Sequence, residues 1–142
     1  KLPSSVLEIG NSAFSGCSLL TEITIPPSIT RINDRVFFQC SSLKRIFIPS
    51  SVQSIGSNAF GECKSLEEIT IPSSVIKMYS CAFAECSSLS QVSILSSEIY
   101  FGDRVFDNFY KLKEISVPYS AKIDTSSSFP SGIRKIRKWQ IL

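Results

Sequence analysis

Histidine is absent from this chain of 142 residues. Without an imidazole ring, the usual Ser-His-Asp and Cys-His arrangements for nucleophilic catalysis are excluded, as are zinc sites that use a histidine ligand. The glutamates follow the repeat described below and show no pattern typical of an active-site pocket, although a pair of catalytic carboxylates stays open as an alternative. We therefore expect a protein that is not an enzyme, with no catalytic residues, no cofactor and no metal site.

Strong charge and long apolar runs are also lacking. The formal net charge is +3, whereas nucleic-acid-binding proteins usually carry a strongly basic face, so we expect no nucleic-acid partner. No stretch approaches the ~20 consecutive apolar residues that span a membrane, so we expect no transmembrane segment. The hydrophobic content of 43% is ordinary for a globular protein and is sufficient for one packed core, which predicts a single domain over residues 1–142.

A period of 23 residues runs through the chain. Proline occupies one position of the repeat, with Leu95 in the one gap: Pro3, Pro26, Pro49, Pro72 and Pro118. Phenylalanine occupies another position: Phe14, Phe37, Phe60, Phe83, Phe106 and Phe129. Leucine and two β-branched residues form a third recurring pattern with the same period, as in Leu66, Ile69 and Ile71. Self-similarity at a fixed period of roughly 20–50 residues is typical of stacked-repeat proteins.

Each repeat is expected to contain one short strand. Ile69 and Ile71 alternate with Glu68 and Thr70, which predicts apolar side chains inward and polar side chains outward. Pro72 is expected to end the strand because proline donates no ladder hydrogen bond. A second apolar pair then packs beneath the strand, and the Ala-Phe-x-x-Cys segment is predicted as one helical or 3₁₀ turn with the ring inside.

Serine recurs at one further position, in every copy. The column comprises Ser5, Ser28, Ser51, Ser74, Ser97 and Ser120. A buried turn must satisfy its backbone polar groups, and a hydroxyl can do so locally. We interpret the column as a structural ladder with no catalytic meaning.

The combined pattern closely resembles the BspA-type leucine-rich repeat. Segment 48–52 (Ile-Pro-Ser-Ser-Val), Ala59-Phe60, Cys63 and Ser65-Leu66 match it almost residue for residue. The resemblance covers nearly the whole chain. It implies an α/β-type leucine-rich-repeat solenoid dominated by short parallel β-strands, with about six 23-residue coils forming a curved right-handed solenoid. The coils start near residues 3, 26, 49, 72, 95 and 118.

The match weakens towards the C-terminus. Leu95 replaces proline, Phe109 replaces cysteine, and in the last copy Ile136, Trp139 and Ile141 fit the strand pattern only with one extra residue. Lys138 and Gln140 would then be exposed. Terminal repeats are often atypical because one side faces solvent. We expect the chain to be a piece of a longer array.

Four of the five cysteines share one position of the repeat. They are Cys17, Cys40, Cys63 and Cys86, with Cys81 outside the column. Adjacent coils lie about 5 Å apart, so disulfides between coils are one alternative. Free thiols acting as small buried hydrophobes are the alternative that we favour, because stacked side chains point the same way and the count is odd. The redox compartment stays open.

The outward strand positions form the candidate partner-binding face. They are Glu22, Thr24, Arg45, Phe47, Glu68, Thr70, Gln91, Ser93, Glu114 and Ser116. Concave sheet faces are the usual binding surfaces of solenoids. Arg45 and Phe47 are the first candidates, because aromatic and arginine side chains dominate interface hot spots and the other Phe47 equivalents are Thr or Ser. The alternative is a merely solvated face with neighbouring opposite charges, on which one exposed Phe is ordinary.

A basic cluster near the C-terminus is the second candidate site. It contains Arg134, Lys135, Arg137 and Lys138, beside Trp139. Such a cluster suits an acidic partner or an anionic membrane surface, and a solvated terminal face is its more usual meaning.

The functional hypotheses come from different classes. The first is a non-enzymatic module that binds a protein partner; the resemblance implies adhesion and binding of host or matrix proteins at the cell surface or after secretion, while a cytoplasmic location stays open. The alternative is a structural scaffold or assembly subunit that packs through repeat ends or sheet edges, so self-association is a further expectation. An enzyme is the weakest hypothesis.

Overall fold

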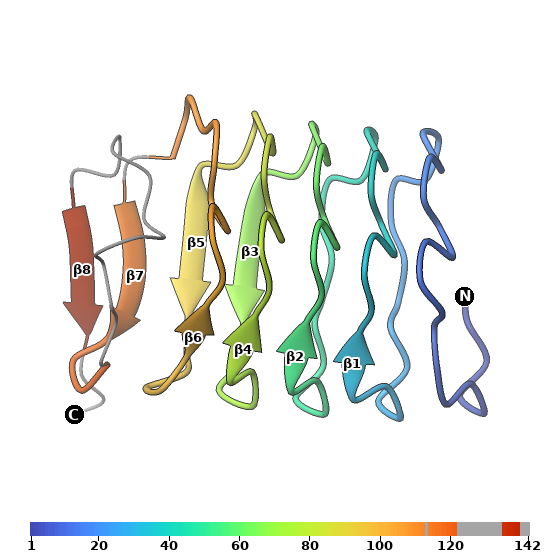
Figure 1. The fold of residues 1–142 in the computed structure, drawn as a ribbon, viewed down its shortest axis with the longest axis horizontal. Coiled ribbons are helices and arrows are strands. Elements are labelled where there is room, and N and C mark those ends of the chain that lie inside the picture. The colour runs from blue at the N-terminus through green and yellow to red at the C-terminus, as the bar shows by residue number, and fades with distance from the viewer. Residues whose placement is uncertain (113, 122–134, 140–142) are drawn as a thin grey trace.

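The chain folds as a stack of coils, each one turn of a solenoid (Figure 1). The computed structural model describes residues 1–112, 114–121 and 135–139. Within this part the regular elements are strands alone: β1 (Arg31–Ile32), β2 (Ser54–Ile55), β3 (Glu68–Ile71), β4 (Lys77–Met78), β5 (Gln91–Ile94), β6 (Tyr100–Phe101), β7 (Glu114–Pro118) and β8 (Lys135–Trp139). The predicted solenoid of short parallel strands is confirmed.

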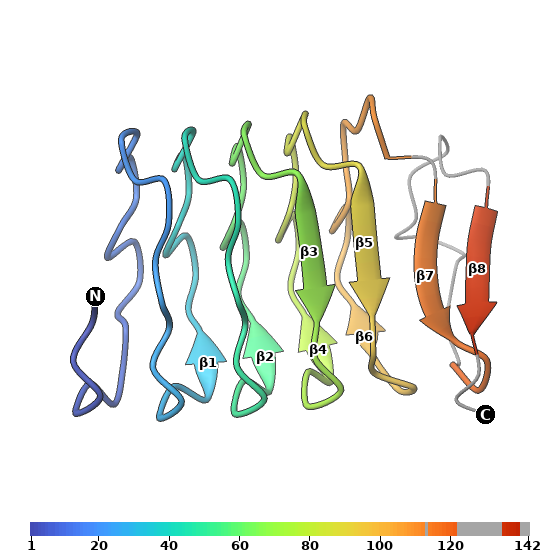
Figure 2. The ribbon, with the colours of Figure 1, turned by 180° about the vertical axis from the view of Figure 1, so that it is seen from behind.

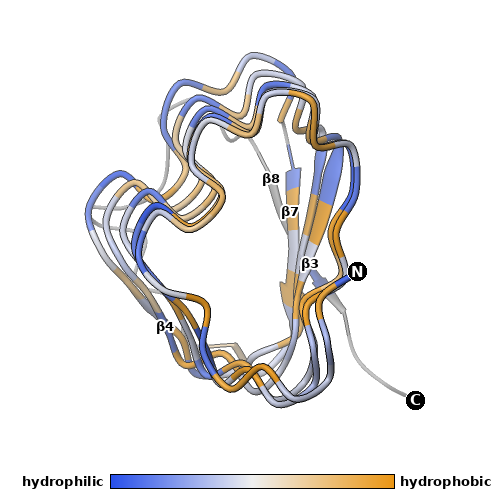
Figure 3. Ribbon diagram, turned by 90° about the vertical axis from the view of Figure 1, so that its right-hand side faces the viewer, coloured by the Kyte–Doolittle hydropathy of each residue, from blue (hydrophilic) through white to orange (hydrophobic). Residues whose placement is uncertain are grey.

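Two parallel sheets run along the stack, on different sides of each coil (Figures 2 and 3). One sheet has the order β3-β5-β7-β8 and the other has the order β1-β2-β4-β6. Up to β7 the register advances by one 23-residue repeat between neighbours, as in Ile69 beside Val92 and Ile55 beside Met78, whereas β8 pairs with β7 at an offset of 21 residues. We call the sheet β3-β5-β7-β8 the long-strand sheet. In the first coils it is reduced to a single bridge between Thr24 and Phe47. The 23-residue period therefore becomes the strand register.

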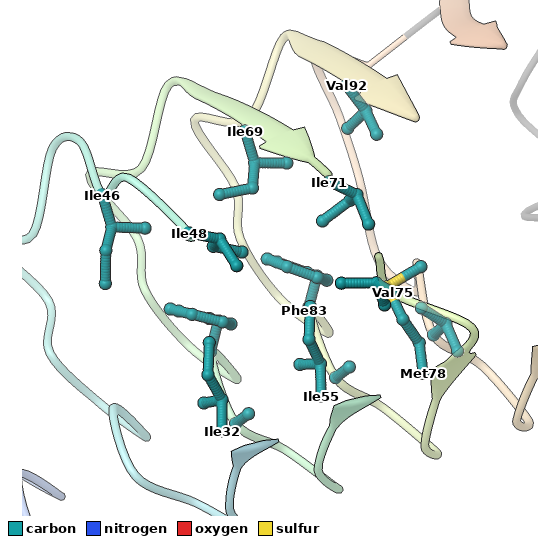
Figure 4. Close-up of a cluster of buried hydrophobic side chains, with 14 of the residues drawn as sticks. Ile32, Ile46, Ile48, Ile55, Ile69, Ile71, Val75, Met78, Phe83 and Val92 are labelled. Atoms are coloured by element: carbon teal, nitrogen blue, oxygen red, sulfur yellow. The ribbon is translucent and has the colours of Figure 1, made fainter. Parts of the chain in front are cut away.

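The strands alternate between core and solvent, as predicted. In β3, Glu68 and Thr70 are exposed whereas Ile69 and Ile71 are buried. The short strands repeat the pattern, because Ile32, Ile55 and Met78 point inward. Figure 4 shows these side chains converging from both sheets into one core. A side-chain period of two is what one buried face requires of a strand.

A column of phenylalanine rings forms the axis of this core. Adjacent rings from Phe14 to Phe106 lie with centroids 4.9–5.7 Å apart and planes within 6–18° of parallel. Phe37, Phe60 and Phe83 have no exposed surface. Each ring thus fills the space between its two neighbours, and the ladder holds successive coils in phase.

The Ala-Phe-x-x-Cys segment forms tight turns and not the predicted helical or 3₁₀ turn. Its alternate N–H groups donate to the next coil: those of Arg35, Phe37 and Gln39 bond to the carbonyl groups of the residues 22 positions further along. A continuous helix would direct these N–H groups back along its own chain. The prediction is wrong because pairing between coils takes the donors that a helix needs.

Left-handed residues produce this alternation. Positive φ angles occur in two columns of 23-residue period: Ser12, Arg35, Asn58, Cys81 and Arg104, and Gly16, Gln39, Glu62, Glu85 and Asn108. L-residues adopt this conformation at a cost of roughly 1–2 kcal/mol, so these columns carry local strain in every coil. Gly16 occupies the second column with φ of 74°, which shows that glycine fits there.

The serine ladder acts between coils. The hydroxyl groups of Ser28, Ser51 and Ser74 donate to the carbonyl oxygens of Val6, Ile29 and Val52, at 2.6–2.7 Å. The structural role is as predicted, but the bonds are not local, because the acceptors belong to the preceding coil.

The turn after β5 departs from the serine column. Ser97 is exposed. Ser96 is buried instead and donates to the carbonyl of Glu98 at 3.0 Å. The serine column is therefore displaced by one residue in this copy, which is also the copy without proline.

The register of the last strand differs from the prediction. One extra residue would have aligned Ile136 with Leu112, but β8 pairs Ile136 with Ile115 and Lys138 with Val117. This register keeps a β-branched residue beside Ile115 in the inward column. Lys138 is exposed, as expected. Gln140, Ile141 and Phe129 lie outside the described residues.

Removing one ring of the ladder should destabilise the fold. Phe60→Ala deletes a fully buried ring between two others and should lower the free energy of unfolding by about 3–5 kcal/mol. Phe47→Ala removes a ring that is 73% exposed and serves as the matched control. Urea denaturation of both variants measures the difference. Equal midpoints would contradict the inward placement of Phe60.

Glycine at a left-handed position should relieve strain. Glu85 has φ of 60° and is exposed, so Glu85→Gly should raise the free energy of unfolding by about 0.5–1 kcal/mol. Glu67→Gly is the control, because Glu67 is exposed and is not among the positive-φ residues; it should destabilise by a similar amount. Thermal unfolding of the two variants measures both effects. A loss of stability in Glu85→Gly as large as in the control would contradict the assignment of strain.

Candidate functional site

The outward columns of the long-strand sheet form one continuous surface, the β3 face. It comprises the ten predicted positions: Glu22, Thr24, Arg45, Phe47, Glu68, Thr70, Gln91, Ser93, Glu114 and Ser116. The structure places all ten outside the core; Ser93, Glu114 and Ser116 are half-buried and the others are exposed. Strand pairing sets Glu68 beside Gln91 and Thr70 beside Ser93. The geometry of the face is therefore as predicted, while its binding role stays a proposal.

An ion pair crosses two coils of this face. Arg45 Nε lies 3.5 Å from Glu68 Oε1, with side chains that are 75% and 53% exposed. Solvent screens such a pair, which contributes about 0.2–1 kcal/mol. Among the described residues, Arg45 forms no ion pair with Glu22. The guanidinium keeps further donors free for a ligand, because a single Nε contact uses one of five.

Phe47 projects from the face between two hollows. Its side chain is 73% exposed and its column is otherwise Thr or Ser. The first hollow, of about 460 Å³, extends from Phe47 past Thr70 and Pro72 to Leu95. The second lies towards Glu22 and Thr24. A large apolar ring beside small side chains leaves concave space on either side of it.

Leu95 forms the far wall of the first hollow and is 38% exposed. Its N–H donates to the carbonyl of Ile71 at 2.9 Å, a bond that proline could not make. Sequence reasoning treated Leu95 as a lapse in the proline column and did not connect it with Phe47. The available signal was an apolar residue at a position that is otherwise proline.

The basic cluster is only partly within the described residues. Lys138 is exposed. The backbone of β8 sets Lys135 beside Glu114 and Arg137 beside Ser116, in register with the outward columns of the β3 face. Arg134 lies outside the described residues. The cluster as a binding site therefore stays a prediction.

The cysteines are free thiols. Cys40, Cys63 and Cys86 are buried, and their Sγ atoms lie 3.1–3.2 Å from the carbonyl oxygens of Phe14, Phe37 and Phe60. Burial raises the pKa of Cys40 to about 11 and that of Cys86 to about 12, and it raises the pKa of Cys63 as well. A thiolate is the reactive form of cysteine. These three side chains are core components, and the alternative of bridges between coils does not hold.

No ligand set for a metal occurs in the described part of the chain: His, Cys, Asp and Glu form no group of three or more there. The same residues contain no helix long and apolar enough to cross a bilayer.

Comparison with known proteins identifies the repeat. The model of the BspA type leucine-rich repeat region matches six copies over residues 7–132. The chain belongs to the BspA-type leucine-rich repeat family. No curated protein matches this BspA-type chain.

Two solved leucine-rich repeat structures share the fold. The leucine-rich repeat protein of T. pallidum is 26% identical, with a TM-score of 0.84; the match covers 98% of this chain and 68% of that chain. A leucine-rich repeat protein from Bacteroides ovatus is 24% identical, with a TM-score of 0.57; the match covers 95% of this chain and 50% of that chain. The second likeness shows the fold alone.

Thiol reactivity should separate the cysteines into two classes. At neutral pH in the native state, a thiol reagent should modify Cys17 and Cys81, which are half-buried. Cys40, Cys63 and Cys86 should react only after denaturation, because they are buried and protonated. Mass spectrometry after timed quenching measures the order. Native modification of all five at one rate would contradict the buried column.

Proposed function

We propose that this BspA-type repeat chain is a non-enzymatic module that binds a protein partner on the β3 face, around Arg45 and Phe47. Leucine-rich repeats commonly mediate protein binding, which supports the general class. The observation that carries the specific proposal is the exposed Phe47 ring between two hollows, one of which ends at Leu95.

The hollow between Phe47 and Leu95 suits one large apolar side chain of a partner. Its walls are a ring and a leucine from different coils, and its rim carries the Arg45–Glu68 pair. Burying an apolar side chain of this size contributes about 1.5–3 kcal/mol. Interfaces commonly place such an anchor at the centre and charged groups at the rim.

We further propose an adhesive role at the cell surface or in a secreted protein. The support is membership of the BspA-type family, together with a face that displays hydroxyl, amide and charged side chains around a single aromatic anchor. Reaction chemistry is not part of the proposal.

Substitution on the β3 face tests the proposal. Purified extracellular-matrix proteins are the probes, and surface plasmon resonance measures their affinity for the wild-type chain and its variants. Phe47→Ala and Arg45→Ala should each make the binding free energy of a partner less favourable by roughly 1–2 kcal/mol or more, as hot-spot truncations do. Unfolding midpoints should stay at the wild-type value.

Ile76→Ala is the matched control, since Ile76 is 61% exposed and adjoins the other sheet. It should leave the affinity unchanged. An unchanged affinity in both β3-face variants would contradict the proposal. Light scattering of the same samples addresses the alternative of an assembly subunit, which requires a mass that rises with concentration.

A further inference from the structure

The sheet that contains β4 carries a second polar surface, unrelated to the β3 face. Strand pairing aligns Arg31, Ser54, Lys77 and Tyr100 in one outward column across four coils. Arg31 and Tyr100 are exposed, and Ser54 and Lys77 are half-buried. Figure 3 shows that β4 and β3 lie on different sides of the coil.

Tyr79 gathers the two cations of this column. Arg31 Cζ lies 5.4 Å from the centroid of the Tyr79 ring, and Lys77 Nζ lies 4.5 Å from the same centroid. Lys77 Nζ is also 5.3 Å from the Tyr100 ring centroid. Cations in this range are attracted to the aromatic face. The Arg31 guanidinium and the Lys77 ammonium group therefore lie near the same ring.

Small residues of the intervening coil make this contact possible. Arg31 and Tyr79 belong to coils two repeats apart, and Ser54 and Gly56 occupy the equivalent positions between them. A Cβ at Gly56 would collide with Asp34, so no side chain is tolerated there. The coil between Arg31 and Tyr79 thus carries one small side chain at Ser54 and none at Gly56.

Neither cation forms an ion pair with another described residue. In residues 1–112, Arg31 and Lys77 have no carboxylate within ion-pair distance. Glu8 precedes Arg31 by one repeat of the sequence, and Asp34 follows it by three residues. Glu8 is within 3.2 Å of the Asn33 amide, and Asp34 accepts the Ser57 N–H at 2.9 Å. Two positive charges on one aromatic ring, neither of them in an ion pair with a described residue, favour an anionic ligand.

The backbone of this surface cannot bind a peptide strand. The N–H groups of Gln53, Gly56, Ile76 and Tyr79 already donate to the preceding coil at 2.7–3.0 Å. Recognition must therefore use side chains alone. Tyr100, which is 64% exposed, adds a flat ring beside Lys77.

We propose that this surface, made of Arg31, Ser54, Lys77, Tyr79 and Tyr100, binds a sulfated polysaccharide chain. Sulfate groups along the chain pair with Arg31 and Lys77, whose guanidinium and ammonium groups are donors suited to such oxyanions. The C–H face of a sugar ring packs on the exposed Tyr100. Ser54 stands between Arg31 and Lys77 in the strand register, and its hydroxyl donates to the same ligand.

Binding to a size-defined heparin oligosaccharide tests this proposal by titration calorimetry with the full chain. The variant Arg31→Gln/Lys77→Gln should lose at least about tenfold in affinity, and the slope of log K against log salt should fall by about two, because two fewer counterions are released. Lys44→Gln is the charge control: Lys44 is exposed near the β3 face and should leave both quantities close to wild type.

Tyr79→Leu provides a second measurement in which both charges remain. Affinity should fall several-fold, because the ring no longer holds the two cations together, and the salt slope should change little. Circular dichroism confirms folding of each variant. De-sulfated heparin and poly-glutamate serve as alternative ligands, and both should bind much more weakly than heparin.

Three results would overturn the proposal. The first is unchanged heparin affinity in the double variant. The second is loss of affinity only when Lys135 and Lys138 of the basic cluster are replaced by Gln. The third is equal binding of heparin and poly-glutamate, which would identify a surface for acidic protein segments instead.

Discussion

Stacking in register, one coil on the next, is the constraint on which this structure depends. A single coil has little regular structure of its own, so its buried N–H and C=O groups need partners in the neighbouring coils. The backbone bonds from the turn segments, the serine hydroxyls on the preceding carbonyls and the thiols beside the Phe carbonyls all meet this need by pairing with an adjacent coil. The stacked rings fill the space between them. Inserting one residue in a coil would break all of these ladders together.

The same constraint acts differently on inward and outward positions of each coil. Inward columns repeat because each side chain must match its equivalents in the adjacent coils. Outward columns are free of that demand, so chemistry can vary from coil to coil without disturbing the stack. Phe47 among hydroxyl-bearing residues on the β3 face, and Arg31, Lys77 and Tyr79 on the other sheet, are such variations. One scaffold thereby presents two chemically different surfaces, one with an apolar anchor and one with unpaired cations.

Much of the fold follows from periodicity, because burial has a clear signature in a repeat. Strand positions, the alternation of Ile69 and Ile71 with outward residues, and the inward Phe column were all predictable. The turn segment was not, since a helix and a chain of tight turns share the same spacing of Ala, Phe and Cys. Left-handed residues such as Arg35 and Glu62 decide between them, and neither residue type favours that conformation. The last strand was misaligned because its pairing with β7 outweighs the spacing pattern.

The sequence by itself determined the repeat, the family, the alternation of inward and outward residues in the long strands before the last one, and the ten positions of the β3 face. These properties depend on one coil and its period, which a linear pattern can carry. Only the tertiary structure decided which side chains of different coils meet: Leu95 across from Phe47, and Arg31 against Tyr79 over Ser54 and Gly56. Such contacts join residues tens of positions apart. They depend on the length of the side chains and on the small residues of the coil between them, and the periodic pattern of the sequence contains information on neither.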